Sequence, residues 1–437
     1  MNERDSEAVA AQLVAKGYTL AAGEATADVI LLNTCSVRDL AELKALRKME
    51  NLAAELRRSR PNVVLGFMGC MAQSRGRELI EQLPDVDLVV GTQKFHHAAD
   101  YVDDLLAGRR EKVVDIEEEA GSETTIREHL LHGASPKSVT AFVSIMQGCN
   151  QYCTFCIVPY TRGEERSRSI EGVVEECREL ARQGVKEITL LGQIVTSFGK
   201  RDLPPKEGKS AFVQLLEAVH KVDGLERIRF TSPHPKGYGQ DLIGAYGQWP
   251  KLVESAHIPV QSGSDRVLKL MHRGYTRDRF LGIVERLRQV RPGIGISTDL
   301  IVGFPGETEE DFEQTLSLVR AAQFQQAFVF KYSPRRDTPA AVMPGQIPQP
   351  VKEERNQRLL ALVNEIAAEQ HSKMVGRRVE ILVEGPSKRN KARMMGRTRC
   401  NKIVVFDGAE RHRGQLLDVT ITRAGSFTLY GDAAILG

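Results

Sequence analysis

Six apolar segments that alternate with helical segments constrain the fold of this chain more than any other feature. Strands separated by helices form parallel sheets, because a parallel connection needs a crossover. Six such units in succession favour a partial (β/α)6 barrel, with functional residues at the carboxyl ends of its strands. The apolar segments are residues 141–149, 187–193, 227–233, 255–263, 295–304 and 324–334.

The first hundred residues show the same alternation on a smaller scale. Apolar strands at 28–35 and 63–70 each end in a cysteine, Cys35 and Cys70, and a further strand covers 87–92. This pattern predicts an open α/β sheet, in which the carboxyl ends of parallel strands share one edge. We therefore expect the two thiols at the same edge of the sheet, although they are far apart in the sequence.

The chain changes character twice after this sheet. Residues 105–138 are charged and acidic, which predicts a linker, and a long helix at about 350–372 ends the barrel series. Short strands with glycine turns follow, the pattern of a small antiparallel β-barrel. The predicted α/β chain thus has an N-terminal open sheet at 1–104, a linker at 105–138, the partial (β/α)6 barrel at 139–368 and a small β-barrel at 369–437.

Composition places the chain of 437 residues among globular proteins, with 41% hydrophobic and 27% charged residues. No apolar run approaches the roughly 20 residues that span a bilayer, and the first ten residues are polar, so we expect a cytoplasmic chain without membrane contact. The net charge of +3 hides a basic C-terminal part, in which residues 371–437 hold 13 Lys and Arg against 6 Asp and Glu. Such a part predicts a polyanionic partner.

The basic residues of this C-terminal part are densest between Lys388 and Lys402, a stretch without an acidic residue. Attraction to RNA phosphates is one interpretation. A solvated loop is the alternative, and it is the more frequent outcome for an isolated charge run. The candidate RNA-binding residues are Lys388, Arg389, Lys391, Arg393, Arg397, Arg399 and Lys402.

Three cysteines in one loop carry the strongest chemical signal. Cys149, Cys153 and Cys156 follow the first barrel strand with CxxxCxxC spacing. Three thiolates at this spacing can hold three irons of a 4Fe-4S cluster and leave the fourth iron open to a substrate or cofactor. A structural zinc site would need a fourth ligand, and the loop offers none. Cys177 and Cys400 have no close cysteine neighbours, which favours packing roles.

The loop CNQYCTFC, with Phe155 as its aromatic residue, resembles the cluster motif of the radical S-adenosylmethionine superfamily. The segments CTFCIVPYTRGEERSR, LLGQ, FTSPHP, HIPVQSGS, DLIVGFPGETEEDF and YSPR are similar to those of the methylthiotransferases, over nearly the whole chain. The basic tail resembles their RNA-binding TRAM domain, and the N-terminal unit resembles their first domain. The resemblance implies that the open iron binds S-adenosylmethionine and that the reduced cluster cleaves it to a 5′-deoxyadenosyl radical.

The resemblance also implies a reaction. PYTRGEE, LLGQ and PVQSGS look most like the branch that adds a methylthio group to carbon 2 of N6-isopentenyladenosine beside the tRNA anticodon. One S-adenosylmethionine would methylate sulfur on an auxiliary cluster, and a second would make the radical that removes the adenine hydrogen. Carbon 2 carries no acidic proton, so radical chemistry suits it. The implied partners of a monomeric enzyme are the anticodon stem-loop of tRNA, an electron donor such as flavodoxin or ferredoxin, and a sulfur or cluster donor.

Members of that family hold the auxiliary 4Fe-4S cluster with three cysteines, and this sequence matches two of them. Cys35 lies in NTCSVR and Cys70 in GCMAQ. The third cysteine and the first strand would fall upstream of Met1, because MNERDSE resembles the sequence that follows that cysteine. We therefore expect a start placed too late or a truncated chain rather than a genuine two-cysteine site.

Further contacts to S-adenosylmethionine are implied at strand ends. Gly192 and Gln193 end the second barrel strand, where superfamily members contact the methionine amino group, and an ordinary turn is the alternative. The guanidinium of Arg168 matches a carboxylate, with a plain surface position as the alternative. His234 and His257 also lie near strand ends, where a lone histidine is more often a core or rim residue. The implied cofactor-binding residues are Phe155, Arg168, Gly192, Gln193, Gln261, Ser262, Ile301 and Gly303.

Two other functions stay open at this point. Another methylthiotransferase, acting on threonylcarbamoyladenosine in tRNA or on an aspartate of a ribosomal protein, would share most of these motifs. A non-catalytic iron–sulfur RNA-binding protein is the alternative from a different class. The vacant fourth ligand argues against it, because a structural cluster is normally closed by four protein ligands.

Overall fold

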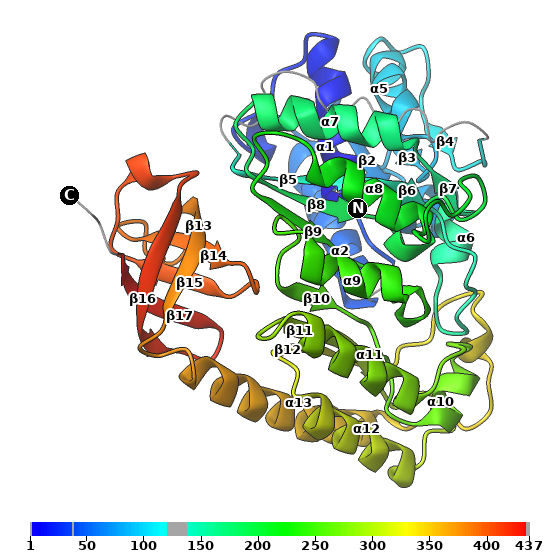
Figure 1. The fold of residues 1–437 in the computed structure, drawn as a ribbon. Helices are drawn as coiled ribbons and strands as arrows, with labels where there is room; N and C mark the ends of the chain where they lie inside the picture. The colour runs from blue at the N-terminus through cyan, green and yellow to red at the C-terminus, as the bar shows by residue number, and fades with distance from the viewer. Residues whose placement is uncertain (1, 37–38, 120–137, 434–437) are drawn as a thin grey trace. The chain divides into compact units, whose positions relative to one another are not determined.

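The computed structural model describes residues 2–36, 39–119 and 138–433 (Figure 1). Its internal contacts divide the chain into two compact units. Unit 1 comprises Met1–Pro136, Met146–Arg168 and Ser333–Ala341, and unit 2 comprises Lys137–Ile145, Ser169–Tyr332 and Val342–Gly437. The predicted boundaries follow the order of the chain, whereas these units do not. The predicted linker lies partly outside the described residues, and its boundaries stay predictions.

A four-stranded parallel sheet, in the order β1-β2-β3-β4, forms the centre of unit 1. Three of its strands are those expected from the sequence. The fourth strand lies in the segment predicted to be a linker. It was not predicted, because two apolar residues inside an acidic segment are a weak signal for a strand. The strands are β1 (Val29–Asn33), β2 (Val64–Met68), β3 (Leu88–Val90) and β4 (Val113–Asp115).

Strand β2 is buried on both faces, which explains its continuous apolar sequence. Leu65 and Phe67 belong to one core cluster, together with residues of helix α2 (Asp39–Leu56). Met68 belongs to a second cluster on the opposite face, which α1 and α5 cover. The further helices of unit 1 are α1 (Asn2–Ala15), α3 (Cys70–Arg75), α4 (Glu78–Gln82), α5 (Ala98–Leu106) and α6 (Val158–Arg162).

Unit 2 contains two three-stranded parallel sheets, β5-β8-β9 and β10-β11-β12. All six strands expected from the sequence are present, and an isolated bridge between Ile228 and Leu252 continues the pairing beyond β9. The partial barrel is therefore confirmed as two half-sheets. Its strands are β5 (Thr140–Ser144), β8 (Glu187–Leu191), β9 (Arg227–Phe230), β10 (Ser255–His257), β11 (Gly295–Val302) and β12 (Gln326–Lys331).

Helices alternate with these strands, as the sequence predicts. At the start of α12, Thr308 and Asp311 form the capping box that their spacing suggests, each side chain accepting a backbone N–H of the other residue. Cys177 is fully buried in α7, as expected for a packing residue. The helices of unit 2 are α7 (Ile170–Arg182), α8 (Ala211–His220), α9 (Gln240–Gln248), α10 (Asp265–Leu270), α11 (Arg277–Val290), α12 (Glu309–Ala322) and α13 (Gln349–Ser372).

The predicted C-terminal β-barrel is confirmed as a closed barrel in the order β13-β14-β15-β17-β16. The sequence analysis missed β14, whose residues lie inside the basic stretch. None of the helices in the described ranges is long and apolar enough to cross a membrane. The barrel strands are β13 (Arg378–Pro386), β14 (Met394–Thr398), β15 (Ile403–Phe406), β16 (Leu416–Ala424) and β17 (Thr428–Ala433).

Candidate functional site

A pair of short antiparallel strands closes the base of the three-cysteine loop in unit 1. β6 (Met146–Gln147) precedes the loop, and β7 (Arg166–Ser167) follows it. Between them Gly148 has a φ of 80°, and a Cβ there would lie 1.8 Å from the carbonyl oxygen of Glu164. No other residue fits that position, so this glycine fixes the direction in which the chain enters the loop.

Hydrogen bonds inside the loop hold its two sides together. The backbone N–H of Asn150 donates to the Glu165 carboxylate at 3.3 Å, and the Glu165 N–H donates to the Asn150 side-chain oxygen at 3.2 Å. The Cys156 N–H donates to the Cys153 carbonyl oxygen at 2.9 Å, which forms a turn. Cys149 and Cys153 are each 7% exposed. Cys156 is partly exposed. Two buried thiols and one partly exposed thiol in a loop with a fixed base are a donor set that fits a 4Fe-4S cluster with one side open.

The cysteine loop is attached to the carboxyl edge of the first sheet through Thr92, which follows β3. The Gln147 side-chain N–H donates to the Thr92 carbonyl oxygen at 3.2 Å. The Thr92 hydroxyl in turn donates to the carbonyl oxygen of Thr161 in α6. Both contacts are buried, so the loop and the sheet edge form one structural element of unit 1.

The sheet brings Cys35 and Cys70 to this same carboxyl edge, as the sequence predicts. Asn33 lies opposite Met68 in the parallel register, and each cysteine follows two residues later. The Thr34 N–H donates to the Met68 carbonyl oxygen at 3.1 Å, which continues the pairing toward both cysteines. Residues far apart in sequence therefore meet through strand register.

Each of these two thiols lies beside an arginine that the sequence analysis did not single out. Arg162 is 2% exposed and donates to the Asp5 carboxylate at 2.6 Å. Burial alone would lower its pKa, but Asp5 and the Cys70 thiol together raise it above the usual value. Burial lowers the pKa of Arg335, and Cys35 partly offsets that effect. Each arginine therefore places a positive charge near one of the two thiols.

The second unit holds six of the eight residues implied in cofactor binding. Gln261 has a φ of 71°, which is uncommon for a residue other than glycine. Its N–H donates to the Asp299 carbonyl oxygen at 2.8 Å, and its carbonyl oxygen accepts the Ile301 N–H at 2.9 Å. Ser262 is fully buried, with its hydroxyl 3.4 Å from that of Thr315. The structure thus brings Gln261 and Ile301 together at one strand end.

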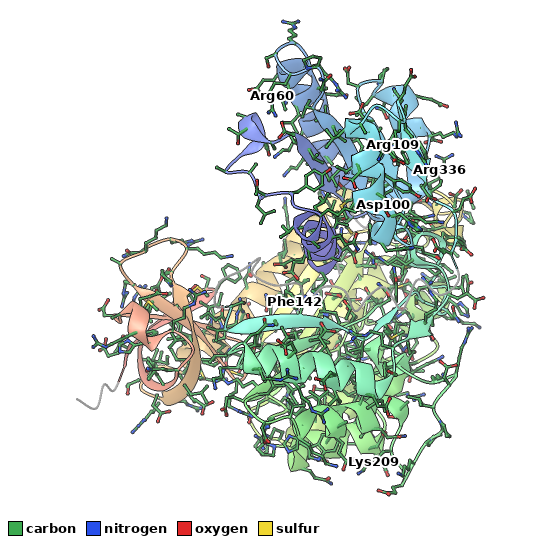
Figure 2. The ribbon with its side chains drawn as sticks, turned by 90° about the horizontal axis from the view of Figure 1, so that it is seen from above. Arg60, Asp100, Arg109, Phe142, Lys209 and Arg336 are labelled. Carbon is green, nitrogen blue, oxygen red and sulfur yellow. The ribbon has the colours of Figure 1, made fainter. Side chains whose placement is uncertain are left out.

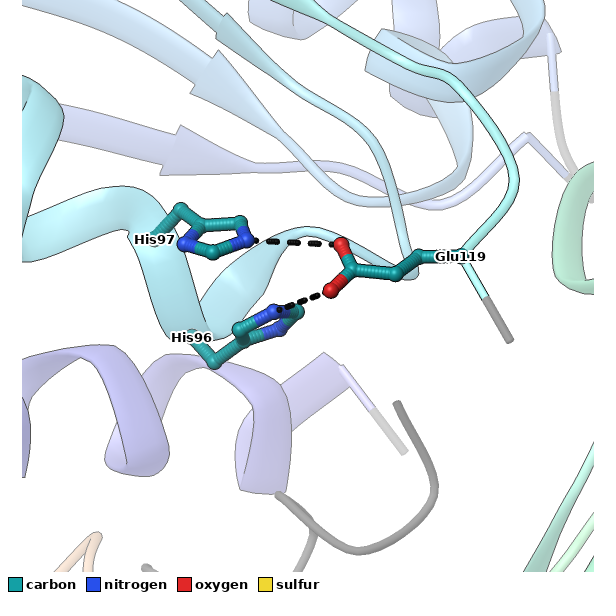
Figure 3. A group of neighbouring side chains, drawn as sticks. All are labelled: His96, His97 and Glu119. Carbon is teal, nitrogen blue, oxygen red and sulfur yellow. Dashed lines mark hydrogen bonds and ion pairs between the residues drawn. The ribbon is translucent and has the colours of Figure 1, made fainter. Parts of the chain in front are cut away.

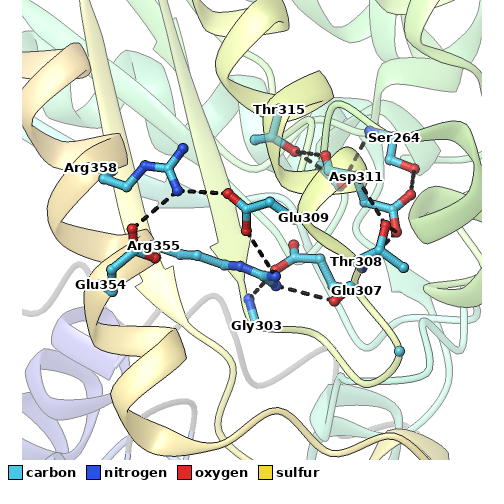
Figure 4. A network of polar contacts seen from close by, with 12 residues as sticks. Ser264, Gly303, Glu307, Thr308, Glu309, Asp311, Thr315, Glu354, Arg355 and Arg358 are labelled. Carbon is cyan, nitrogen blue, oxygen red and sulfur yellow. Dashed lines mark hydrogen bonds and ion pairs between the residues drawn. The ribbon is translucent and has the colours of Figure 1, made fainter.

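The turn after β11 is fixed by helix α13, as Figure 4 shows. The Gly303 N–H donates to the Glu307 carboxylate at 2.7 Å, and Arg355 of α13 donates to the same oxygen at 2.8 Å. Gly303 has a φ of 71°, and a Cβ there would lie 2.4 Å from a methylene carbon of Lys352. The glycine is therefore required for close packing, whether or not it also contacts a cofactor.

Gln193 follows β8 and has a side-chain oxygen that is buried without a hydrogen-bond partner among the described residues. A buried acceptor of this kind needs a donor, and an amino group would supply one. Gly192 is buried next to it. Phe155 and Arg168 belong to unit 1, whereas the other six residues belong to unit 2, and Arg168 is 6% exposed.

The seven basic candidates for RNA binding fall into three groups. Three are exposed in the loop between β13 and β14, namely Lys388, Arg389 and Lys391. Three form ion pairs within unit 2, Arg393 with Asp407 at 2.7 Å, Arg397 with Glu384 at 2.9 Å and Arg399 with Glu254 at 2.6 Å. Lys402 is buried, and burial lowers its pKa. RNA contact stays a prediction for all seven, and the exposed loop favours the first three.

The two histidines near strand ends are a core residue and a rim residue. His234 is 4% exposed, accepts the Lys236 N–H at 3.2 Å, and has a pKa that burial lowers to about 2. His257 lies 3.0 Å from the Ser297 hydroxyl and 3.3 Å from the Asp299 carboxylate. Their polar contacts suit structural roles.

A further set of possible metal ligands occurs in unit 1, where His96, His97 and Glu119 place three ligand atoms within 4.8 Å of one another (Figure 3). The imidazole Nε2 atoms lie 3.1 and 3.3 Å from the carboxylate oxygens. Lys94 lies 2.9 Å from the same carboxylate, and its hydrogen bond contributes most to lowering the Glu119 pKa to about 2. Because an ammonium already neutralises Glu119, these residues form a hydrogen-bonded cluster and do not indicate a cation site.

Comparison with known protein families assigns all three regions of the chain. Residues 143–319 match the radical SAM superfamily, and residues 372–434 match the TRAM domain. Residues 1–91 match a family described as uncharacterized protein family UPF0004. Among solved structures, a radical S-adenosylmethionine methyltransferase, TsrM from Kitasatospora setae, covers 72% of this chain and 66% of its own, with a TM-score of 0.53 at 14% identity. That likeness supports the fold.

Curated relatives resemble the chain over almost its full length. A tRNA-2-methylthio-N(6)-dimethylallyladenosine synthase from Akkermansia muciniphila is 54% identical, over 99% of this chain and 96% of the relative. Proteins of the same name from Opitutus terrae and Methylacidiphilum infernorum are 52% and 51% identical, over 100% of this chain and 96% and 93% of the relatives. The chain therefore belongs to the radical S-adenosylmethionine methylthiotransferase family, together with these synthases.

Proposed function

We propose that this chain is a tRNA-2-methylthio-N6-dimethylallyladenosine synthase, which adds a methylthio group to carbon 2 of N6-isopentenyladenosine in tRNA. The observation that carries the proposal is the shielded loop with Cys149, Cys153 and Cys156, joined in one chain to a TRAM-type barrel. The name of the full-length relatives supports the substrate. The family membership disfavours the non-catalytic alternative.

The three loop cysteines would hold the cluster that binds S-adenosylmethionine. A 4Fe-4S cluster with an open iron supplies reductive cleavage of that cofactor, the chemistry that an unactivated C–H bond requires. Around it the chain would orient the cofactor through its own groups. Gln193 offers a buried acceptor to the methionine amino group, and Arg168 offers a guanidinium to the carboxylate. The remaining proposed contacts are Phe155, Gly192, Gln261, Ser262, Ile301 and Gly303.

Cys35 and Cys70 would hold a second, auxiliary 4Fe-4S cluster from the edge of the first sheet. Their shared edge and the arginine beside each thiol support this assignment. Arg162 has one guanidinium nitrogen that is buried without a partner among the described residues, so it could donate to a sulfur ligand there. A monomeric enzyme would draw electrons from flavodoxin or ferredoxin and sulfur from a separate donor.

The RNA substrate would be held by the TRAM barrel. Lys388, Arg389 and Lys391 project from one loop and offer sequence-independent attraction to phosphates. The target adenosine lies in a single-stranded loop of tRNA, where a base can be turned out without breaking a duplex. Recognition of the backbone would therefore use the C-terminal barrel of unit 2, whereas modification of the base would use the cluster held by the three-cysteine loop of unit 1.

Nucleoside mass spectrometry on tRNA tests the proposal. The tRNA would come from a host that lacks this modification and expresses either the chain or its Cys153→Ala variant. We expect 2-methylthio-isopentenyladenosine with the chain and unmodified isopentenyladenosine with the variant. A repeat with an upstream Gly-Cys segment added would show whether a third auxiliary cysteine is needed. Continued absence of the product with both versions would refute the substrate assignment.

A further inference from the structure

Unit 2 contains a partly open cavity of about 450 Å3, which residues of its two half-sheets and of its C-terminal barrel line. We call it the barrel chamber. Phe142 of β5 and Phe328 of β12 line it from the two half-sheets, together with Thr189 and His257, and Arg397 and Glu384 line it from the C-terminal barrel. Its volume lies within the range of small-molecule sites and suffices for a nucleoside with a short substituent.

Three phenylalanines line the barrel chamber, and two of them, Phe142 and Phe328, are exposed, whereas Phe230 is buried. Phe142, labelled in Figure 2, is 36% exposed, and Phe328 is 42% exposed with its ring 6.1 Å from that of His257. Both lie on strands of the barrel, where side chains that face inward normally fill the core. Leaving apolar rings uncovered in a cavity is unfavourable, and an apolar ligand would remove that cost.

The arginine and glutamate side chains that line the chamber form ion pairs with one another. Arg229 donates to Glu187 at 2.7 Å, and Arg397 pairs with Glu384 at 2.9 Å. His257 is bonded to Ser297 and Asp299, as described above. Charges matched in this way leave little net attraction for an anionic ligand group, whereas the two rings remain uncovered.

We propose that Phe142 and Phe328 receive the dimethylallyl group of the target nucleotide and thereby set the preference for prenylated tRNA. This inference rests on the proposed function and specifies how that function selects its substrate. A five-carbon branched alkene is apolar and fits against aromatic rings, and burying it would remove both its own surface and theirs from water. A substituent with a carboxylate, such as threonylcarbamoyl, would lose its hydration in the chamber. The arginines there already pair with glutamates, so they would not compensate for that loss.

The test compares two substitutions of equal size at each phenylalanine. Leucine and asparagine have nearly the same shape, but only leucine keeps the apolar contact. Dissociation constants would be measured for anticodon stem-loops with and without the dimethylallyl group, using reconstituted full-length wild-type chain, Phe142→Leu, Phe142→Asn, Phe328→Leu and Phe328→Asn. Val290→Ala, on the exposed end of α11, serves as a surface control. Uncoupled cleavage of S-adenosylmethionine would show that each variant retains its cofactor site.

We expect the wild-type chain to bind the prenylated stem-loop more tightly than the stem-loop without the prenyl group. In the asparagine variants, the ratio of the two dissociation constants should fall by about tenfold. The leucine variants and the control should retain it, and affinity for the stem-loop without the prenyl group should stay the same in all of them. Equal preference in the leucine and asparagine variants, or no preference in the wild-type chain, would overturn the inference. Failure of the proposed function would instead appear as a wild-type chain that forms no methylthio product.

Discussion

The two sets of cysteines in this chain are positioned in different ways. Cys149, Cys153 and Cys156 lie in one loop, whose base is closed by the β6–β7 pair and by Gly148. Cys35 and Cys70 lie at the same edge of the sheet because β1 and β2 pair in parallel register. The geometry of a site within one loop is determined by a short stretch of sequence. A site between strands depends on the stability of a whole sheet.

The largest effect should follow loss of a loop cysteine. Cys153→Ala removes one of three ligands that have no substitute in the loop, so we expect loss of cleavage of S-adenosylmethionine and of the methylthio product. The fold should persist, because the loop base does not involve this side chain. Iron content and circular dichroism check both statements. Cys177→Ala, in the core of unit 2, is the matched control, and loss of activity in that control would contradict the assignment.

The site of Cys35 and Cys70 should instead depend on the stability of unit 1, which holds the sheet. Arg162→Met leaves the Asp5 carboxylate buried without its partner, which should lower the free energy of unfolding by about 3–5 kcal/mol. The double variant Arg162→Met/Asp5→Asn should regain part of that loss, since no charge remains uncompensated. Urea unfolding at pH 7 measures both changes. A double variant no more stable than the single one would show that the ion pair is not the cause.

Loss of the exposed basic loop should have a smaller effect, confined to RNA binding. The triple variant Lys388→Ala/Arg389→Ala/Lys391→Ala should weaken tRNA affinity by about tenfold at low salt and reduce the slope of log affinity against log salt by about 2. Lys221→Ala, an exposed lysine on the α8 side of unit 2, is the control. Binding isotherms at several salt concentrations give the slope. A slope equal to that of the wild-type chain would mean that this loop does not contact phosphates.

The smallest effect should be a pH dependence caused by His234. Burial lowers its pKa to about 2, whereas an unfolded histidine has a pKa of about 6.5. Below pH 6.5 the unfolded chain therefore binds a proton that the folded chain does not, and stability falls as pH falls, by at most about 1.4 kcal/mol per pH unit. His234→Asn keeps an acceptor for Lys236 and does not titrate. Between pH 7.5 and 5.5, the free energy of unfolding measured in urea should change less for this variant than for the wild-type chain. An identical change in both would contradict the lowered pKa of His234.

The sequence predicted most of the strands, because apolar runs are a local and regular signal. It also predicted the edge shared by Cys35 and Cys70, because each cysteine directly follows such a run and the carboxyl ends of parallel strands share one edge. It did not predict β4, a strand of three residues in an acidic segment. It also missed Arg162, although that residue lies in the segment PYTRGEE, because nothing in one sequence distinguishes a buried arginine from a surface one.

The ion pairs of Arg393, Arg397 and Arg399 show a related limit. Their sequence pattern predicted either attraction to RNA phosphates or a solvated loop, but the strand and turn that hold these arginines place acidic partners nearby. Phe142 and Phe328 are likewise ordinary strand residues in the sequence. Only the structure shows that both line a chamber.

The central claim is that the three-cysteine loop directs radical chemistry to carbon 2 of the prenylated adenosine. A stem-loop carrying deuterium at that carbon, incubated with the reconstituted chain, a reductant and S-adenosylmethionine, tests it directly. We expect deuterium in 5′-deoxyadenosine together with the methylthio product. Formation of the product without deuterium in 5′-deoxyadenosine would contradict it.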